Sequence, residues 1–119
     1  MMTRAVLPGM LARRAGKILT VASDLSRRPL ANMSTYVAAK HGVLGFSASL
    51  LREVKDQGVR VMTLMPGIMD TDFNGPPGDR EETWAMNPDH VADLALNMLT
   101  QPAYLMMDEV TVHPMHQEL

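Results

Sequence analysis

Residues 17–40 read KILTVASDLSRRPLANMSTYVAAK and combine three local patterns. Residues 17–22 (KILTVA) are mostly apolar with several β-branched side chains, which is typical of a strand buried in a parallel sheet. Charged residues and a proline follow, and they indicate a polar loop. A helical pattern then begins near Ser34 and continues to about Asp56. These residues therefore predict a strand, a connection and a long helix.

The rest of the chain continues this alternation of helices and strands. The predicted elements are a helix over residues 3–15 closed by Gly16, the strand over 17–22, the helix over 34–56 closed by Gly58, a strand over 59–65 (VRVMTLM), a helix beginning at Asn87 and Pro88, and a strand over 109–112. Strands that alternate with helices form parallel sheets joined by crossover helices. The sequence therefore predicts an α/β fold with about three parallel strands.

Two segments have no predicted helix or strand. Residues 70–86 are rich in glycine, proline and charge, including the run GPPGD, and this composition predicts a long surface loop or lid. The residues after Val112 read HPMHQEL, for which we expect a surface tail.

Composition excludes several classes of function. The 119 residues carry a formal net charge of -2, so the chain lacks the broad positive surface that would attract nucleic acid or an anionic membrane. The absence of cysteine excludes disulfides, thiolate metal sites and a thiol nucleophile, and it fits a cytoplasmic location. No apolar run has the length of a membrane span, and the first residues lack a secretory signal pattern.

Three residues in the region that follows the first strand have side chains suited to catalysis. Ser23 comes directly after this strand, Tyr36 follows thirteen positions later, and Lys40 follows Tyr36 by four. Tyr36 and Lys40 then lie on the same helix face. Taken alone, they fit an ordinary surface pair, and Ser23 fits a turn cap. Their combination with a Pro-Gly turn at residues 66–67, after the second strand, favours a catalytic site.

At this point the sequence resembles the short-chain dehydrogenase/reductase family. The family's serine and Tyr-x-x-x-Lys motif match ILTVAS, ending at Ser23, and YVAAK at residues 36–40. The segments AAKHGVLGFSASLLREV and VRVMTLMPGIMDTDF also look like its helix and its strand with a Pro-Gly turn and a threonine. The resemblance extends over about residues 6–114. It implies an oxidoreductase that uses NAD or NADP and a small carbonyl or alcohol substrate.

The resemblance implies a role for each of the three residues. Tyr36 would donate the proton that a reduced carbonyl oxygen requires, and it would also contact the cofactor. Lys40 would stabilise the phenolate electrostatically and bind the ribose hydroxyls of the cofactor. Ser23 would donate a hydrogen bond to the substrate oxygen and stabilise its developing charge.

The turn after the second predicted strand is the expected cofactor contact. Pro66 and Gly67 lie at the carboxyl end of that strand, where ligands bind in open α/β sheets. Gly67, without a side chain, would let the nicotinamide approach the backbone. By resemblance, the backbone of Ile68 would contact the carboxamide, and Thr71 would contact the carboxamide or the phosphates. Phe73 and Trp84 fall in the segment that covers the substrate in this family.

The resemblance also implies that residues 1–119 form one partial domain, the C-terminal half of a Rossmann-fold domain with a doubly wound parallel sheet. The sequence contains no counterpart of the family's N-terminal Gly-rich turn, and the catalytic asparagine of many relatives would precede Met1. We therefore expect a truncated oxidoreductase that is inactive by itself. Two alternatives are a non-catalytic fragment that packs against a partner, and an epimerase or dehydratase with the same tyrosine and lysine.

Three further features have both a functional and a simple structural interpretation. Arg27 and Arg28 favour either an anionic substrate or surface solubility. Small residues recur along the helix over residues 34–56 and indicate close packing, and the family commonly forms dimers through this region. The histidines at 113 and 116 have no convincing third ligand, so we expect no metal and a solvated tail. The small residues are Ala38, Gly42, Gly45 and Ser49.

Overall fold

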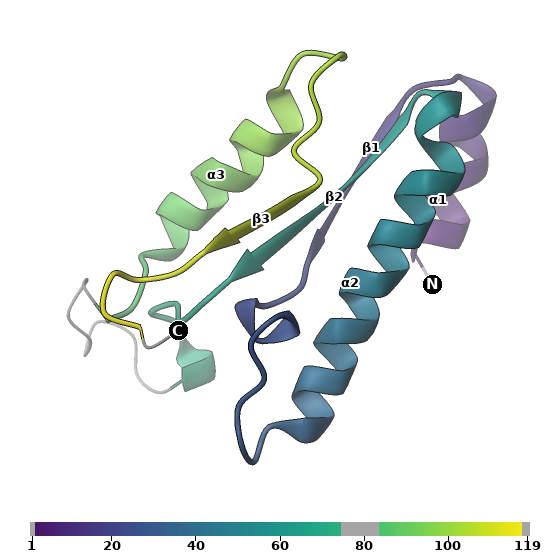
Figure 1. The fold of residues 1–119 in the computed structure, drawn as a ribbon. Helices are drawn as coiled ribbons and strands as arrows, with labels where there is room; N and C mark the ends of the chain where they lie inside the picture. The colour runs from purple at the N-terminus through teal and green to yellow at the C-terminus, as the bar shows by residue number, and fades with distance from the viewer. Residues whose placement is uncertain (1, 75–83, 118–119) are drawn as a thin grey trace.

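The structure is a computed structural model that describes residues 2–74 and 84–117. Its helices and strands are α1 (Met2–Ala12), β1 (Gly16–Val21), α2 (Ser34–Val54), β2 (Val59–Pro66), α3 (Pro88–Thr100) and β3 (Glu109–Val112) (Figure 1). The strands are parallel in the order β1-β2-β3, so β2 is central. The predicted α/β fold with parallel strands and crossover helices is thus confirmed.

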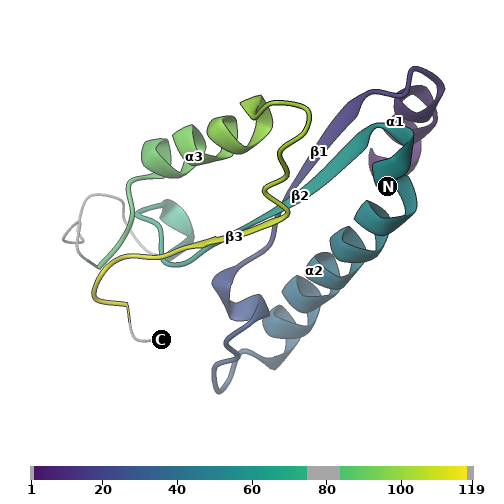
Figure 2. The same ribbon diagram turned by 45° about the horizontal axis from the view of Figure 1, so that its top comes forward.

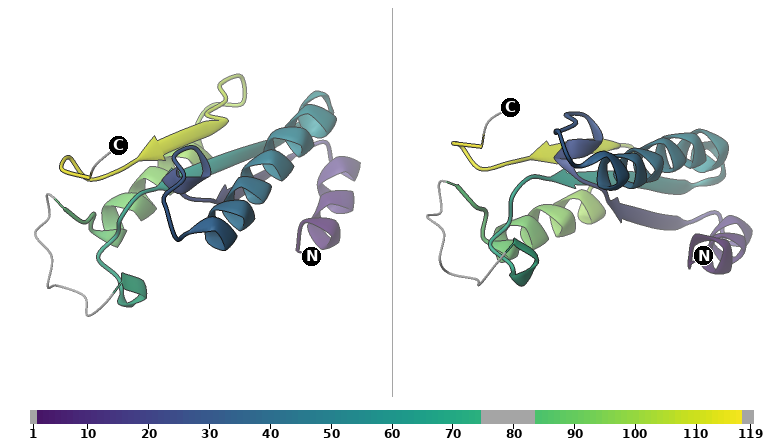
Figure 3. Two further views of the ribbon diagram at one scale, coloured as in Figure 1. Left: turned by 60° about the horizontal axis from the view of Figure 1, so that its bottom comes forward. Right: turned by 90° about the horizontal axis from the view of Figure 1, so that it is seen from below.

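The central strand β2 is covered on both faces. Val59 and Val61 lie in a core cluster with side chains from α1 and α2. Met62 and Leu64 lie in a second cluster with side chains from α3. Figures 2 and 3 show α2 and α3 on opposite sides of the sheet. Because successive side chains of a strand point to opposite faces, the continuous apolar run of β2 fits a strand buried on both sides.

The strand β1 is less buried than its sequence predicts. Its residues are half-buried or exposed, and the Val21 side chain remains 52% exposed. The cause is position, because β1 pairs only with β2 within the part of the chain that the structure describes. Its other edge is therefore unpaired, and the prediction of a buried strand is wrong for β1.

The helix ends follow the predicted capping with one exception. Asn87 accepts a hydrogen bond from the Asp89 backbone N–H and caps α3 as predicted. Gly58 adopts the left-handed conformation (φ 80°) after α2, again as predicted. However, α1 ends before Gly16, and Arg14 is the left-handed residue there (φ 51°). An added Cβ at Gly16 would overlap Met10, so packing between α1 and β1 explains this glycine.

We expect Gly58→Ala to destabilise the chain by about 1–3 kcal/mol, because of the strained backbone it would create. The alanine Cβ would also overlap the carbonyl oxygen of Arg14. Gly42→Ala is the matched control, since a Cβ there meets no atom within 4 Å. It should stabilise the helix by about 0.5–1 kcal/mol. Thermal unfolding of both variants at one protein concentration measures the difference, and equal melting temperatures would contradict this assignment.

The small-residue stripe of α2 is open to solvent. Its four residues are exposed, and an added Cβ at either of its glycines meets no atom within 4 Å. The described part of this chain therefore does not pack against the stripe.

No described helix is long and apolar enough to cross a membrane.

Candidate active site

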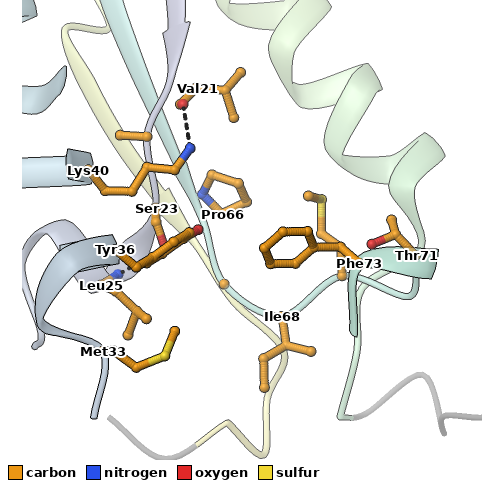
Figure 4. Close-up of a pocket in the computed structure, with 13 residues that line it drawn as sticks. Val21, Ser23, Leu25, Met33, Tyr36, Lys40, Pro66, Ile68, Thr71 and Phe73 are labelled. Atoms are coloured by element: carbon orange, nitrogen blue, oxygen red, sulfur yellow. Dashed lines mark hydrogen bonds between the residues drawn. The ribbon is translucent and has the colours of Figure 1, made fainter. Parts of the chain in front are cut away.

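A cavity of about 430 Å³ opens where β1 and β2 end and α2 begins (Figure 4). It lies at the carboxyl edge of the sheet, as expected for a ligand site in this class of fold. Its volume falls within the range of about 300–1,000 Å³ that is usual for small-molecule sites. The structure brings all the predicted site residues together in the lining of this cavity. They are Ser23, Tyr36, Lys40, Pro66, Gly67, Ile68 and Thr71.

Ser23 is held at the end of β1 by two local hydrogen bonds. Its Oγ accepts from the Leu25 N–H at 3.2 Å and caps a short 3-10 helix (Asp24–Ser26). The same hydroxyl donates to Asp24 Oδ1 at 3.2 Å. Ser23 is therefore both a turn cap and a cavity residue. To donate to a substrate oxygen, its hydroxyl has to turn away from Asp24.

Tyr36 and Lys40 lie in the first turns of α2 and face the cavity together. The Lys40 Nζ is 5.7 Å from the centroid of the Tyr36 ring, which is cation–π range. Lys40 also donates to the Val21 carbonyl oxygen at 3.4 Å, and Figure 4 shows this bond above the tyrosine. The helix spacing thus places the ammonium beside the phenol.

The main-chain N–H and carbonyl oxygen of Ile68 both already have hydrogen-bond partners. Its N–H donates to Gln117 Oε1 at 2.9 Å, and its carbonyl oxygen accepts from the Met86 N–H at 2.9 Å. The predicted backbone contact with a cofactor carboxamide therefore requires an exchange of partners. The side chain of Ile68 lines the cavity independently of these bonds.

The C-terminal segment is part of the framework around the site, and the prediction of a solvated surface tail is wrong for His113, Pro114 and Gln117, whereas Met115 and His116 are exposed as predicted. Pro114 is buried, and Gln117 hydrogen-bonds Ile68 and Asp24. An added Cβ at Gly67 would overlap Gln117 Oε1 and lie 2.9 Å from the Cβ of His113. The packing of this segment therefore requires a glycine at position 67. That Gly67 also lets a nicotinamide approach the backbone stays a prediction.

Two aromatic residues lie within the segment, residues 70–86, that the sequence predicts as a loop or lid. Phe73 is 78% exposed, lines the cavity and lies 6.5 Å from the Tyr36 ring, centroid to centroid. Trp84 instead packs beside His116, with the ring centroids 5.5 Å apart. The GPPGD run falls in residues 75–83, outside the described residues.

The arginines after β1 do not line the cavity. Arg27 forms an ion pair with Glu109, and Arg28 pairs with Asp24 at 3.0 Å. Their placement gives no support to the idea that they select an anionic substrate.

In the described ranges, no three His, Cys, Asp or Glu side chains are grouped so that they could hold a metal ion.

Comparison with known proteins agrees with this geometry. A family model described as short chain dehydrogenase matches residues 1–82. The 3-oxoacyl-[acyl-carrier-protein] reductase FabG of Vibrio cholerae is 40% identical over 82 residues, which are 69% of this chain and 34% of the relative. An uncharacterized oxidoreductase of Staphylococcus saprophyticus is 34% identical over 112 residues, which are 92% of this chain and 47% of the relative.

A solved alcohol dehydrogenase from the archaeon Thermococcus sibiricus, complexed with 5-hydroxy-NADP, superposes with a TM-score of 0.86 and 27% identity. The match covers 98% of this chain and 49% of that structure. This chain thus spans about a third to a half of the length of these three proteins. The Rossmann-like fold is confirmed, and the chain belongs to the short-chain dehydrogenase family.

Proposed function

We propose that this chain carries the catalytic half of an NAD(P)-dependent oxidoreductase that interconverts a carbonyl and an alcohol. One observation carries the proposal: Ser23 after β1 and the Tyr36–Lys40 pair of α2 line the same cavity. The names of the relatives, a reductase and a dehydrogenase among them, support the same class of reaction.

In this proposal the three side chains act on one oxygen atom. A nicotinamide held in this cavity would supply hydride to the carbonyl carbon of the substrate, and negative charge would then develop on the carbonyl oxygen. Ser23 stabilises that oxygen with a hydrogen bond. Tyr36 transfers its hydroxyl proton to it and becomes a phenolate, which the Lys40 ammonium stabilises. In the oxidative direction each transfer is reversed.

The cavity fits the nicotinamide end of such a cofactor. Its walls combine apolar side chains, including Val21, Pro66 and Ile68, with the polar groups of Tyr36 and Lys40. A flat ring with a polar substituent suits a site of this kind. The 5-hydroxy-NADP in the alcohol dehydrogenase supports a nicotinamide cofactor, without a choice between NAD and NADP for this chain.

A second candidate function is packing against a partner without catalysis. The unpaired edge of β1 and the exposed Val21 favour it, because such an edge accepts another strand. The exposed stripe of α2 offers a second contact, and we propose a homo-oligomer through it. The charge of Lys40 separates the two candidates, because the oxidoreductase needs it and the packing function does not.

The test uses what we call the extended protein, in which a complete nucleotide-binding half from a relative precedes this chain. Lys40→Met is expected to raise the Kd for the cofactor about tenfold or more, since a hydrogen bond from a charged group is worth about 1.5–3 kcal/mol. Carbonyl reduction should fall as well, because the phenolate loses its ammonium. Fluorescence titration with NADH and NADPH measures the first effect.

Lys55→Met is the matched control, because Lys55 is exposed beyond the far end of α2. It should leave both quantities unchanged. If Lys40→Met binds the cofactor as tightly as the parent protein, Lys40 has no role at the ribose. If the parent extended protein reduces no carbonyl, the packing candidate is favoured.

A further inference from the structure

The side-chain carboxamide of Gln117 joins two loops that flank the cavity. Its Oε1 accepts from the Ile68 N–H at 2.9 Å, in the turn after β2. Its Nε2 donates to Asp24 Oδ2, directly after Ser23 and β1. Gln117 is half-buried, and its own N–H donates to the Pro114 carbonyl oxygen at 3.2 Å, which closes a turn. One amide group therefore connects the loop of Ser23 to the loop of Ile68.

Asp24 transmits this connection to Ser23. Asp24 is 3% exposed, and a buried carboxylate needs hydrogen-bond partners. Oδ2 accepts from Gln117 and from Arg28, the latter at 3.0 Å, while Oδ1 accepts from the Ser23 hydroxyl at 3.2 Å. Gln117 and Arg28 thus fix the Asp24 carboxylate, and with it the loop that carries Ser23.

Gln117 acts from outside the cavity. It is not among the residues that line the cavity, although Gly67 and Ile68 are. The space where a Gly67 side chain would lie is filled by Gln117 and His113. The carboxamide therefore supports the Pro66–Gly67 turn from behind and leaves the cavity itself open.

We infer that Gln117 is a positioning residue that sets the spacing between Ser23 and the main chain of Ile68. This inference rests on the proposed oxidoreductase function. Glutamine fits the position because one planar group supplies an acceptor for the Ile68 N–H and a donor for Asp24. A glutamate of the same shape would keep the acceptor but face the Asp24 carboxylate with a second negative charge, and leucine would supply neither bond.

The first test needs no catalysis and uses the 119-residue chain. Gln117→Leu is expected to raise the hydrogen-exchange rate of the Ile68 amide about tenfold or more, because that N–H loses its acceptor. Gln101→Leu is the matched control, since the side chain of Gln101 bonds only Asn97 among the described residues and lies at the end of α3. An unchanged exchange rate at Ile68 in Gln117→Leu would overturn the inference.

The second test uses the extended protein and a rescue. Gln117→Glu should lower kcat about tenfold or more, because repulsion between two carboxylates displaces the Ser23 loop. Asp24→Asn in the same chain should recover most of that loss, since an amide can donate to the new glutamate. The melting temperatures of both variants, measured beside kcat, separate positioning from general stability, and absence of the recovery would overturn the inference. If the parent protein has no reductase activity, the proposed function fails, and the exchange measurement still decides whether Gln117 fixes the Ile68 loop.

Discussion

Tyr36→Phe is expected to lower carbonyl reduction by the extended protein at least about a hundredfold, which is the usual contribution of general acid catalysis. The change removes only the hydroxyl that would protonate the substrate oxygen. The ring keeps its place between Lys40, whose Nζ is 5.7 Å from its centroid, and Phe73, whose ring is 6.5 Å away. Folding and cofactor affinity should therefore change little, and the loss should fall on kcat.

Absorbance of NADPH or NADH at a saturating carbonyl concentration measures this loss. Tyr104→Phe is the matched control, because Tyr104 is 88% exposed in the loop after α3 and lies outside the cavity. It should retain full turnover. If Tyr36→Phe turned over near the parent rate, Tyr36 would not be the proton donor. The proton would then have to come from water.

The sequence predicts those parts of the molecule that depend on contacts close along the chain. Tyr36 and Lys40 share a helix face, and Asn87 caps the helix that follows it, so both arrangements can be read from spacing. The meeting of Ser23 with the Pro66–Gly67 turn also follows, because parallel strands place their carboxyl ends at one edge. For this reason the sequence alone predicts that these site residues meet at one edge of the sheet.

The remaining features depend on tertiary contacts that no local pattern contains. The bond between Gln117 and Asp24 joins residues 93 positions apart, and the bond between Gln117 and Ile68 spans 49. A polar segment near a terminus favours a surface tail unless such partners are known. Likewise, the apolar pattern of β1 predicts burial, whereas its exposure follows from its place at the edge of the described sheet.

The 119-residue chain alone is expected neither to reduce a carbonyl with NAD(P)H nor to bind that cofactor tightly. A dinucleotide needs a phosphate cradle of backbone N–H groups, usually at a Gly-rich turn between a strand and a helix. Here the connection after β1, residues 22–33, contains no glycine, and it carries the acidic side chain of Asp24. In the proposed oxidoreductase, residues 17–40 would therefore supply the catalytic end of the site but not its phosphate end.

The unpaired edge of β1 adds an energetic reason. Among the described residues its backbone donors and acceptors have no strand partner on that side, and Val21 is 52% exposed beside them, so we expect the isolated chain to associate with itself. Isothermal titration with NADH and NADPH, together with sedimentation velocity, measures both expectations, and the extended protein is the positive control. Saturable micromolar binding by the 119-residue chain would falsify the prediction, because residues outside the cavity at β1 and β2 would then have to hold the phosphates.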